Sequence, residues 1–197
     1  CNSIVVNNMH DIEYDKLDLV IEVAHPSIII DYGVDIIKYC SFMPLSLTAF
    51  AQQNIYKAIV EKAQLSQTTL YIAKGANIDL KMLHINKDKW ESVQVITTKH
   101  PQNLGVISQS DNIAKTLYTG STWGICKLYP RNVNRHAAIA LATIGFDKTQ
   151  SILISDPQAS MGVLRCKAIS SDLVLDITRK TTMVGVSGTA MISSIAD

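Results

Sequence analysis

The sequence lacks the patterns that most readily identify a function. Its nine glycines form neither GxGxxG nor GxxxxGK[ST], so no phosphate-binding loop can be assigned. It also contains no zinc-ligand spacing, no HExxH and no nucleophile elbow, and we expect no metal site. None of its apolar runs reaches the roughly 18–20 residues that cross a bilayer. We therefore expect no membrane partner.

Neither charge nor cysteine points to a particular partner. The formal net charge is +1, with Lys and Arg scattered along the chain, which argues against binding to nucleic acid or anionic lipid. The four cysteines, Cys1, Cys40, Cys126 and Cys166, form no CxxC pair. We expect them to be reduced and mostly buried in a cytoplasmic protein. The chain begins without Met, which is typical of a fragment or a processed form.

The first part of the chain alternates between predicted strands and helices. With 47% hydrophobic residues in 197, the chain is a globular protein of one or two small domains. The segment "LDLVIEV" is typical of a strand buried on both faces of a parallel sheet. The predicted order is strand 17–23, helix 27–40, strand and loop 42–50, helix 52–66 and strand 68–76. This α/β pattern predicts a partial Rossmann-type parallel sheet over residues 1–76.

The pattern changes after residue 77 to strands with one face in water. This predicts an α+β domain over residues 77–180 with a mostly antiparallel sheet. The apolar tail "GVSGTAMISSIAD" predicts a C-terminal helix, within residues 181–197, that completes the first domain. The predicted strands are 90–100, 113–121, 150–156, 162–170 and 172–180.

Two strand ends of the first domain are candidate ligand-binding positions, because open parallel sheets bind ligands beyond the carboxyl ends of their strands. The first is Ala24-His25-Pro26. His25 either lines a cofactor cleft and exchanges a proton near pH 7, or is a loop residue that caps the strand. The second is Lys74-Gly75-Ala76. Gly75 either permits close approach of a ligand or marks an ordinary strand-to-loop junction, and Lys74 could hold an anionic substrate group.

The stretch "YPRNVNRHAAIALATIGFD" gathers polar side chains where a helix begins. Asn132 or Asn134 is well suited to cap that helix. Capping does not require the second asparagine, Arg131 or Arg135. The remaining polar groups would also suit a carboxylate or phosphate ligand at this helix terminus, and both interpretations stay open here.

Several stretches together resemble the L-aspartate dehydrogenase family, and most closely its animal members. They are "DLVIEVAHPSIIIDYGVDIIKYC", "YIAKGA", "LYPRNVNRHAAIALATIGFD" and "ILISDP", in this order and spacing. The resemblance implies a Rossmann domain that binds NAD or NADP, and an α+β domain that contacts the substrate and forms a homodimer. It also implies oxidation of L-aspartate, or a similar amino acid, to iminoaspartate, which hydrolyses to oxaloacetate and ammonia, and a role in NAD biosynthesis.

The resemblance also assigns site residues. Ala24, His25, Pro26, Gly75 and Ala76 would line the cofactor cleft, and Asn132 and Asn134 would approach the nicotinamide and the substrate. Apart from what the resemblance assigns, His136 and His25 are candidate general bases, because Gly162 stands nearest the place of the expected catalytic histidine, and Lys74 could engage a substrate carboxylate.

Three departures from the family pattern define an alternative. The glycine-rich turn has no counterpart, Gly162 is the residue nearest the expected catalytic histidine, and the loop after Ala76 is compressed. These losses indicate either a catalytically inactive dimeric binding or structural protein with this fold, or a sequence from which segments have been omitted.

Overall fold

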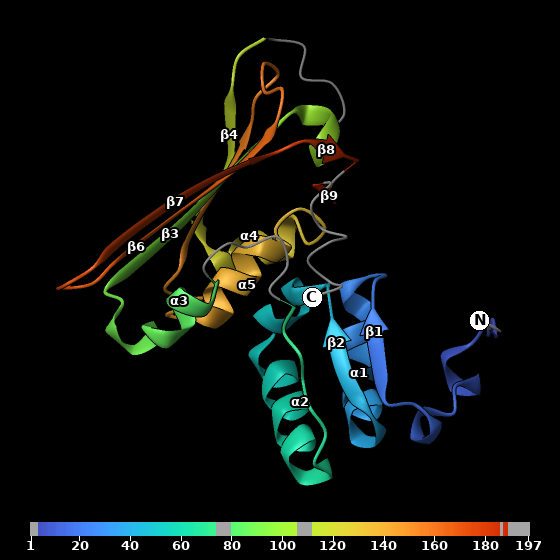
Figure 1. The fold of residues 1–197 in the computed structure, drawn as a ribbon. Coiled ribbons are helices and arrows are strands. Elements are labelled where there is room, and N and C mark those ends of the chain that lie inside the picture. Colours follow the sequence, from blue (N-terminus) through green and yellow to red (C-terminus); the bar gives the residue numbers. More distant parts are fainter. Residues whose placement is uncertain (1–3, 74–79, 106–111, 186, 189–197) are drawn as a thin grey trace.

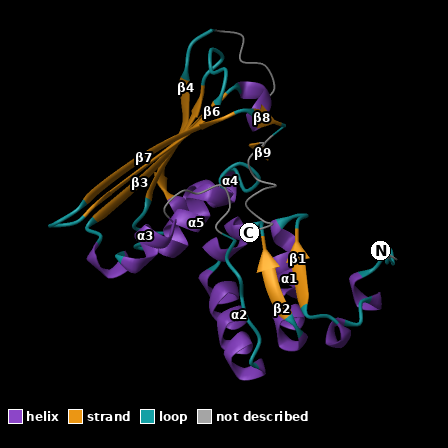
Figure 2. Ribbon diagram, viewed as in Figure 1, coloured by secondary structure: helices purple, strands orange, loops and turns teal. Residues whose placement is uncertain are grey.

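A computed structural model describes residues 4–73, 80–105, 112–185 and 187–188. The N-terminal portion contains two short 3-10 helices, η1 (Met9–Asp11) and η2 (Tyr14–Lys16), followed by alternating strands and helices. Figures 1 and 2 show these elements beside a larger sheet that is built from the C-terminal half. The alternating elements are β1 (Leu19–Glu22), α1 (Pro26–Tyr39), β2 (Ser41–Pro44), the 3-10 helix η3 (Leu47–Ala51) and α2 (Gln53–Ser66).

Strands β1 and β2 pair in parallel, as the βαβ pattern predicts. The strand expected over residues 68–76 is reduced to one parallel bridge between Phe42 and Leu70. Hydrogen bonds from Phe42 N to Thr69 O at 3.0 Å and from Tyr71 N to Phe42 O at 2.8 Å flank this bridge. The described part of this sheet is therefore small, and residues 74–76 of the expected strand lie outside the described residues.

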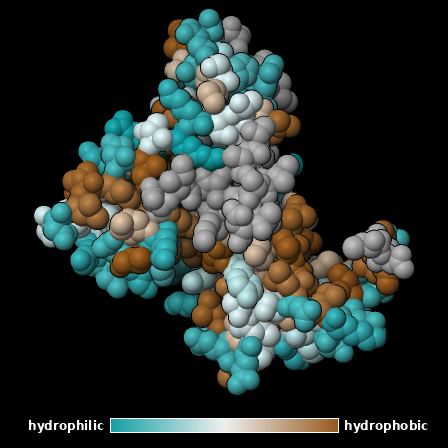
Figure 3. Space-filling view, in the orientation of Figure 1, coloured by the Kyte–Doolittle hydropathy of each residue, from teal (hydrophilic) through white to brown (hydrophobic). Residues whose placement is uncertain are grey.

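The prediction that β1 is buried on both faces is wrong for this structure. The side chains of Leu19, Ile21 and Val23 are 38%, 44% and 73% exposed, whereas the alternate residue Glu22 is buried. Figure 3 shows hydrophobic residues gathered over this part of the surface. The sequence pattern correctly identified an apolar strand, but no described element covers the face opposite α1.

Helix α1 begins where His25 caps it and Pro26 takes the first helical position, a favourable place for proline. It buries Ile29, Ile36 and Ile37 together with Gly33. A Cβ built at Gly33 would lie 2.7 Å from Ile59 Cδ1 of α2. Glycine at this position therefore permits the close packing of α1 against α2.

The C-terminal portion is dominated by a five-stranded sheet in the order β4-β5-β3-β6-β7. Only β3 and β5 pair in parallel, and the other three neighbouring pairs are antiparallel. This confirms the predicted mostly antiparallel α+β pattern. The strands are β3 (Ser92–Lys99), β4 (Lys115–Ser121), β5 (Gln150–Ser155), β6 (Gly162–Ile169) and β7 (Val174–Thr181).

Three helices lie on one face of this sheet and separate it from the N-terminal portion (Figure 2). They are α3 (Leu80–Ile85), α4 (Thr122–Leu128) and α5 (Asn134–Ala142), accompanied by the 3-10 helices η4 (Lys87–Lys89) and η5 (Pro101–Leu104). Helices α4 and α5 both contact η3 of the N-terminal portion. The hydrophobic core is continuous across this junction, from Phe50 of η3 to Ile139 of α5.

The described part of the C-terminal tail is extended. Strands β8 (Met183–Val184) and β9 (Ser187–Gly188) pair antiparallel. Residues 189–197 of the expected C-terminal helix lie outside the described residues, and for them the helix stays a prediction. Over the described residues, no helix is long and apolar enough to cross a membrane.

Candidate functional site

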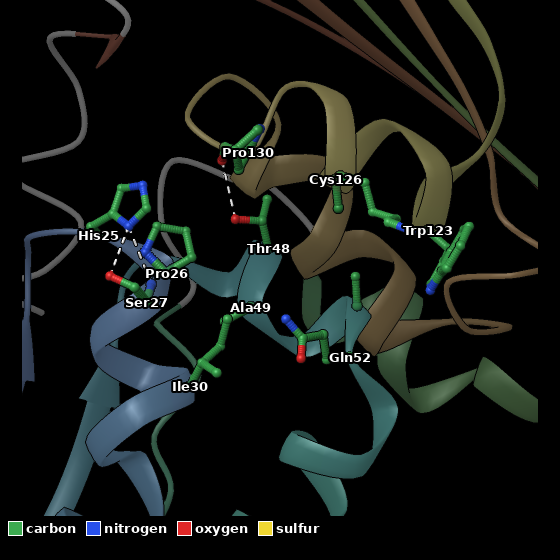
Figure 4. A pocket seen from close by; sticks show the side chains of 12 residues that line it. His25, Pro26, Ser27, Ile30, Thr48, Ala49, Gln52, Trp123, Cys126 and Pro130 are labelled. Carbon is green, nitrogen blue, oxygen red and sulfur yellow. Dashed lines mark hydrogen bonds between the residues drawn. The ribbon is translucent and has the colours of Figure 1, made fainter.

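A cavity of about 480 Å³ lies where the N-terminal portion meets α4 (Figure 4). This volume is within the range of small-molecule sites. Its walls come from the start of α1, from η3, from α4 and from the loop before α5, and most of them are apolar. The lining residues are His25, Pro26, Ser27, Ile30, Thr48, Ala49, Ala51, Gln52, Trp123, Cys126, Lys127 and Pro130.

His25 and Pro26 line this cavity at the end of β1, as expected for a parallel sheet. The Nδ1 atom of His25 accepts a hydrogen bond from Ser27 N at 3.2 Å and lies 3.0 Å from Ser27 Oγ. His25 therefore caps α1, whereas the sequence pattern predicted that it lines a cofactor cleft or caps the preceding strand. Its ring is exposed at the cavity (Figure 4). Ala24 is not among the residues that line the cavity, and its N–H donates to Glu22 Oε1.

Glu22 is a buried carboxylate that the sequence reading missed. It is 4% exposed, and it accepts hydrogen bonds from Ala24 N at 2.7 Å and from Ser46 N and Oγ, both at 3.0 Å. These charge-assisted bonds compensate its burial. They also fix the ends of β1 and β2 beside the cavity. The sequence pattern that could have identified Glu22 is an acidic residue inside an otherwise apolar strand.

Asn134 connects the two portions of the chain. Its Oδ1 accepts a hydrogen bond from Thr48 N at 3.3 Å, and Thr48 Oγ1 donates to Pro130 O at 3.1 Å. Since Thr48 and Pro130 line the cavity, Asn134 lies directly behind its wall. The prediction that an asparagine side chain caps α5 is wrong. The cap residue is Val133, and no side-chain cap hydrogen bond is made.

Asn132 faces away from the cavity, toward β3 and η5. Its Nδ2 donates to Leu104 O at 3.1 Å, and its Oδ1 and main-chain O accept from Lys99 Nζ at 3.5 and 3.4 Å. The structure therefore brings His25 and Pro26 close to the Pro130–Asn134 segment, as the resemblance implied. However, neither asparagine is among the residues that line this cavity.

His136 is a core residue, and this argues against its predicted role as general base. It is 0% exposed, with Nε2 2.8 Å from Thr97 Oγ1 and Nδ1 2.8 Å from Ser151 Oγ. Burial, followed by the charges of Lys99 and Arg135, lowers the pKa of His136 to about 3. A neutral imidazole with both nitrogens engaged connects α5 to β3 and β5, and it has no open nitrogen for a substrate.

The sequence analysis also missed that a buried lysine and a partly buried arginine lie side by side near the start of α5. Lys99, at the end of β3, is 3% exposed, and burial followed by the charge of Arg135 lowers its pKa to about 8. Burial and the charge of Arg179 lower the pKa of Arg135 to about 10. The sequence offered Arg135 as a surplus polar group at this helix, but gave no sign that Lys99 would lie beside it.

The remaining predicted positions divide into two groups. Lys74, Gly75 and Ala76 lie outside the described residues. Gly162, nearest the expected catalytic histidine, is buried, and a Cβ there would come within 2.6 Å of Met183 Sδ. The side chain of Met183 therefore fills the space into which a larger residue would project.

Among the described residues, no group of three or more His, Cys, Asp or Glu side chains could hold a metal ion.

Comparison with known proteins is consistent with this architecture. Residues 80–190 match the family described as "Aspartate dehydrogenase, C-terminal". An aspartate dehydrogenase domain-containing protein of Xenopus tropicalis is 32% identical over 163 residues, which are 77% of this chain and 57% of that protein. An L-aspartate dehydrogenase of Nitrosopumilus maritimus is 28% identical over 163 residues, which are 78% of this chain and 60% of that protein.

The fold is also found in a solved structure of an aspartate dehydrogenase. The crystal structure of an aspartate dehydrogenase from Thermotoga maritima superposes with a TM-score of 0.77 at 22% identity, covering 100% of this chain and 77% of that one. This confirms the mixed α/β fold. The chain spans less than two thirds of the length of the curated relatives described above.

Proposed function

Because the chain belongs to the aspartate dehydrogenase family, we propose that it carries out the reaction of an NAD(P)-dependent L-aspartate dehydrogenase. L-aspartate would be oxidised at its α-carbon to iminoaspartate, which hydrolyses to oxaloacetate and ammonia. The observation that carries this proposal is the shared cavity, which joins His25 and Pro26 at the end of β1 to Thr48 and Pro130 next to Asn134. Such a junction between two portions of a chain is a common place for a ligand.

The described residues fit the nicotinamide end of the cofactor better than its phosphates. The cavity is largely apolar, with Ser27, Gln52 and the His25 ring among its polar groups. The printed sequence has no glycine-rich turn to receive a pyrophosphate. When bound, the cofactor supplies the acceptor for the hydride of the substrate. We propose that His25, Pro26 and the wall formed by Thr48 and Pro130 hold its nicotinamide end.

The capping geometry defines what His25 can do in this site. Because Nδ1 accepts from Ser27 N, a neutral His25 carries its proton on Nε2. That N–H would donate to an oxygen of the cofactor amide or of the substrate. His25 would thus orient a ligand rather than remove a proton from it.

The proposal also covers the oligomeric state, the localisation and the domain division. The helices α3, α4 and α5 cover one face of the five-stranded sheet (Figure 1), and we propose that a second copy covers the other face in a homodimer. We also propose that the protein is cytoplasmic, because Cys40, Cys126 and Cys166 are free and buried. The domain division near residue 76 is a further part of this proposal.

The second candidate function is a catalytically inactive member of the family that serves as a dimeric binding or structural protein. Two observations favour it. Met183 fills the space beside Gly162, nearest the expected catalytic histidine. His136, the replacement base suggested by the sequence, is buried with both nitrogens engaged.

The two candidates are separated by a kinetic and a binding measurement. NADH or NADPH formation from L-aspartate at alkaline pH is expected for the enzyme, with loss of turnover in Asn134→Ala. A rise in melting temperature with saturating NAD or NADP should accompany it. A folded, dimeric chain that shows neither product nor thermal shift would establish the inactive alternative.

A further inference from the structure

The candidate cavity is larger than the nicotinamide end of a cofactor requires. Its volume is about 480 Å³, whereas a cavity of about 150 Å³ is enough to hold an aromatic ring the size of benzene. Figure 4 shows His25 at one end of the cavity and Trp123 of α4 at the other. A ring bound beside His25, Thr48 and Pro130 therefore leaves the end at α4 open for a second group.

The α4 end of the cavity is apolar. We define it by Ala51 of η3 and by Trp123 and Cys126 of α4, all of which line the cavity. The side chains of Ala51 and Cys126 are each 4% exposed. Burial raises the pKa of the Cys126 thiol to about 12, so the thiol stays neutral and behaves as a small hydrophobic group. These two small side chains leave space that larger residues would fill.

Trp123 provides a large apolar surface at this end. It is 42% exposed, although the burial of an indole ring is strongly favourable. The ammonium of Lys127, on the next turn of α4, lies 4.3 Å from the centroid of the Trp123 ring. This contact restrains a partly open aromatic ring at the cavity (Figure 4). An apolar ligand group that contacts the ring would be removed from water together with it.

Gln52 supplies hydrogen-bonding groups between the two ends of the cavity (Figure 4). Its side-chain amide has two N–H donors and one acceptor. An α-amino acid whose α-carbon faces the nicotinamide end would place its α-carboxylate near these donors. The side chain of that amino acid would then extend toward Trp123.

We propose that the α4 end of the cavity binds the side chain of an α-amino acid substrate, and that this side chain is apolar. This rests on the proposed function and deepens it, because it extends the same oxidation to amino acids with alkyl side chains. A side-chain carboxylate at this end would exchange water for an alanine, a thiol and an indole, which is unfavourable. The exposed ammonium of Lys127 already contacts the Trp123 ring. An alkyl chain gains at the same place, since each buried methylene favours binding.

The reaction is the one already proposed, with a different side chain on the substrate. The ammonium group loses one proton, and the α-carbon gives its hydrogen with both bonding electrons to the oxidised nicotinamide cofactor. Water then hydrolyses the resulting iminium to a 2-oxo acid and ammonium.

L-Norleucine is a suitable probe and L-alanine is its short counterpart, because their side chains differ only in the number of methylene groups. Calorimetric titration of the chain is carried out without cofactor and again with saturating NADH, which permits binding but no oxidation. L-Norleucine should bind saturably in at least one of these conditions. Its affinity should exceed that of L-alanine at least about tenfold, because its additional methylene groups are buried.

Trp123→Ala tests the α4 end directly. It should weaken L-norleucine binding at least about fivefold, because the alkyl chain loses its contact with the indole. Trp123→Phe should restore most of the affinity, since it again provides an aromatic ring, and it also excludes unfolding as the cause of the loss. Tyr39→Ala is the matched control, because Tyr39 is 50% exposed and has the ammonium of Lys38 4.7 Å from its ring centroid. It should leave the affinity unchanged.

Three results would overturn the assignment. The first is that L-norleucine does not bind saturably in either condition, and the second is that it binds no more tightly than L-alanine. The third is an affinity for L-norleucine that Trp123→Ala does not change.

The outcome can be separated from the fate of the dehydrogenase proposal. Trp123-dependent binding of L-norleucine by a chain that oxidises no amino acid would uphold the apolar site and reject the enzyme. Oxidation of L-aspartate by a chain that neither binds nor oxidises L-norleucine would uphold the enzyme and reject this site.

Discussion

The main-chain N–H of Thr48 donates a hydrogen bond to Oδ1 of Asn134 at 3.3 Å, between residues that belong to different portions of the fold. Asn134 is the first residue of α5, and Thr48 lies within η3. This contact, together with the bond from Thr48 Oγ1 to Pro130 O, fixes the relative positions of the two walls of the cavity. An amide side chain thus aligns two segments that the sequence separates by more than 80 residues.

Asn134→Ala tests this alignment. Removing the acceptor leaves a partly buried N–H without its partner, so we expect the free energy of unfolding to fall by about 1–2 kcal/mol. Urea denaturation measures the change. Asn54→Ala, at an exposed position of α2, is the control and should change stability by less than about 0.5 kcal/mol. Equal effects of the two substitutions would show that the Thr48–Asn134 bond contributes nothing.

Glu22→Ala should be among the more damaging substitutions in the N-terminal portion. It removes an acceptor that serves Ala24 N, Ser46 N and Ser46 Oγ, and leaves these donors without their partner. We expect a loss of about 2–4 kcal/mol in the free energy of unfolding, measured by urea denaturation. Glu61→Ala, on the exposed side of α2, is the matched control. A stability loss no larger than that of Glu61→Ala would contradict the structural role of Glu22.

Acid should destabilise the protein through His136. Burial lowers its pKa from 6.5 to about 3 in the folded state, so the unfolded chain binds the extra proton between these values. The contribution of neutral His136 to the free energy of unfolding is therefore fully present above pH 6.5. It decreases as the pH falls toward 3, by up to about 1.4 kcal/mol per pH unit.

Comparison of His136→Gln with the parent chain isolates this effect. Urea denaturation at pH 7.5, 6.5, 5.5 and 4.5 should show that the stability gap between them narrows as the pH falls, because glutamine has no proton to gain. His84→Gln, at an exposed position of α3, should keep the slope of the parent chain. Parallel pH profiles for His136→Gln and the parent would mean that His136 does not titrate on unfolding.

The buried thiols should resist alkylation in the folded protein. Burial raises the pKa of Cys126 to about 12, and burial together with the charge of Asp176 does the same for Cys166. Since the thiolate is the reactive form, iodoacetamide at pH 8 should leave both unmodified, and modify both in urea. Peptide mass spectrometry resolves the two sites. Rapid native labelling of either one would show that its part of the core opens.

The sequence predicted where helices and strands lie better than it predicted which other elements pack against them. Helices α1 and α2 follow from local signals, since the Pro26 start and the spacing of Ile29, Ile36 and Ile37 are all near in sequence. The exposure of Leu19 and Ile21 could not be predicted in this way. It depends on whether another element covers the second face of the sheet, which the strand itself does not encode.

The site was predicted only in part for the same reason. His25 and Pro26 were found because a strand end is a local feature with a known use. His136 was misassigned because its burial results from Thr97 and Ser151, on strands distant in sequence. Lys99 was missed because no local sequence pattern indicates that it lies beside Arg135, which is distant in the sequence.

The single parallel pair in the five-stranded sheet has a consequence for how the chain folds. Gln94 of β3 pairs with Gln150 of β5, and β4, α4 and α5 lie between these two strands in the sequence. Bringing β3 and β5 together therefore closes a long loop, and the entropic cost of this closure comes before the strands gain their contacts. The hairpin of β6 and β7 can form early by itself, while completion of the sheet around β3 should limit the rate of refolding.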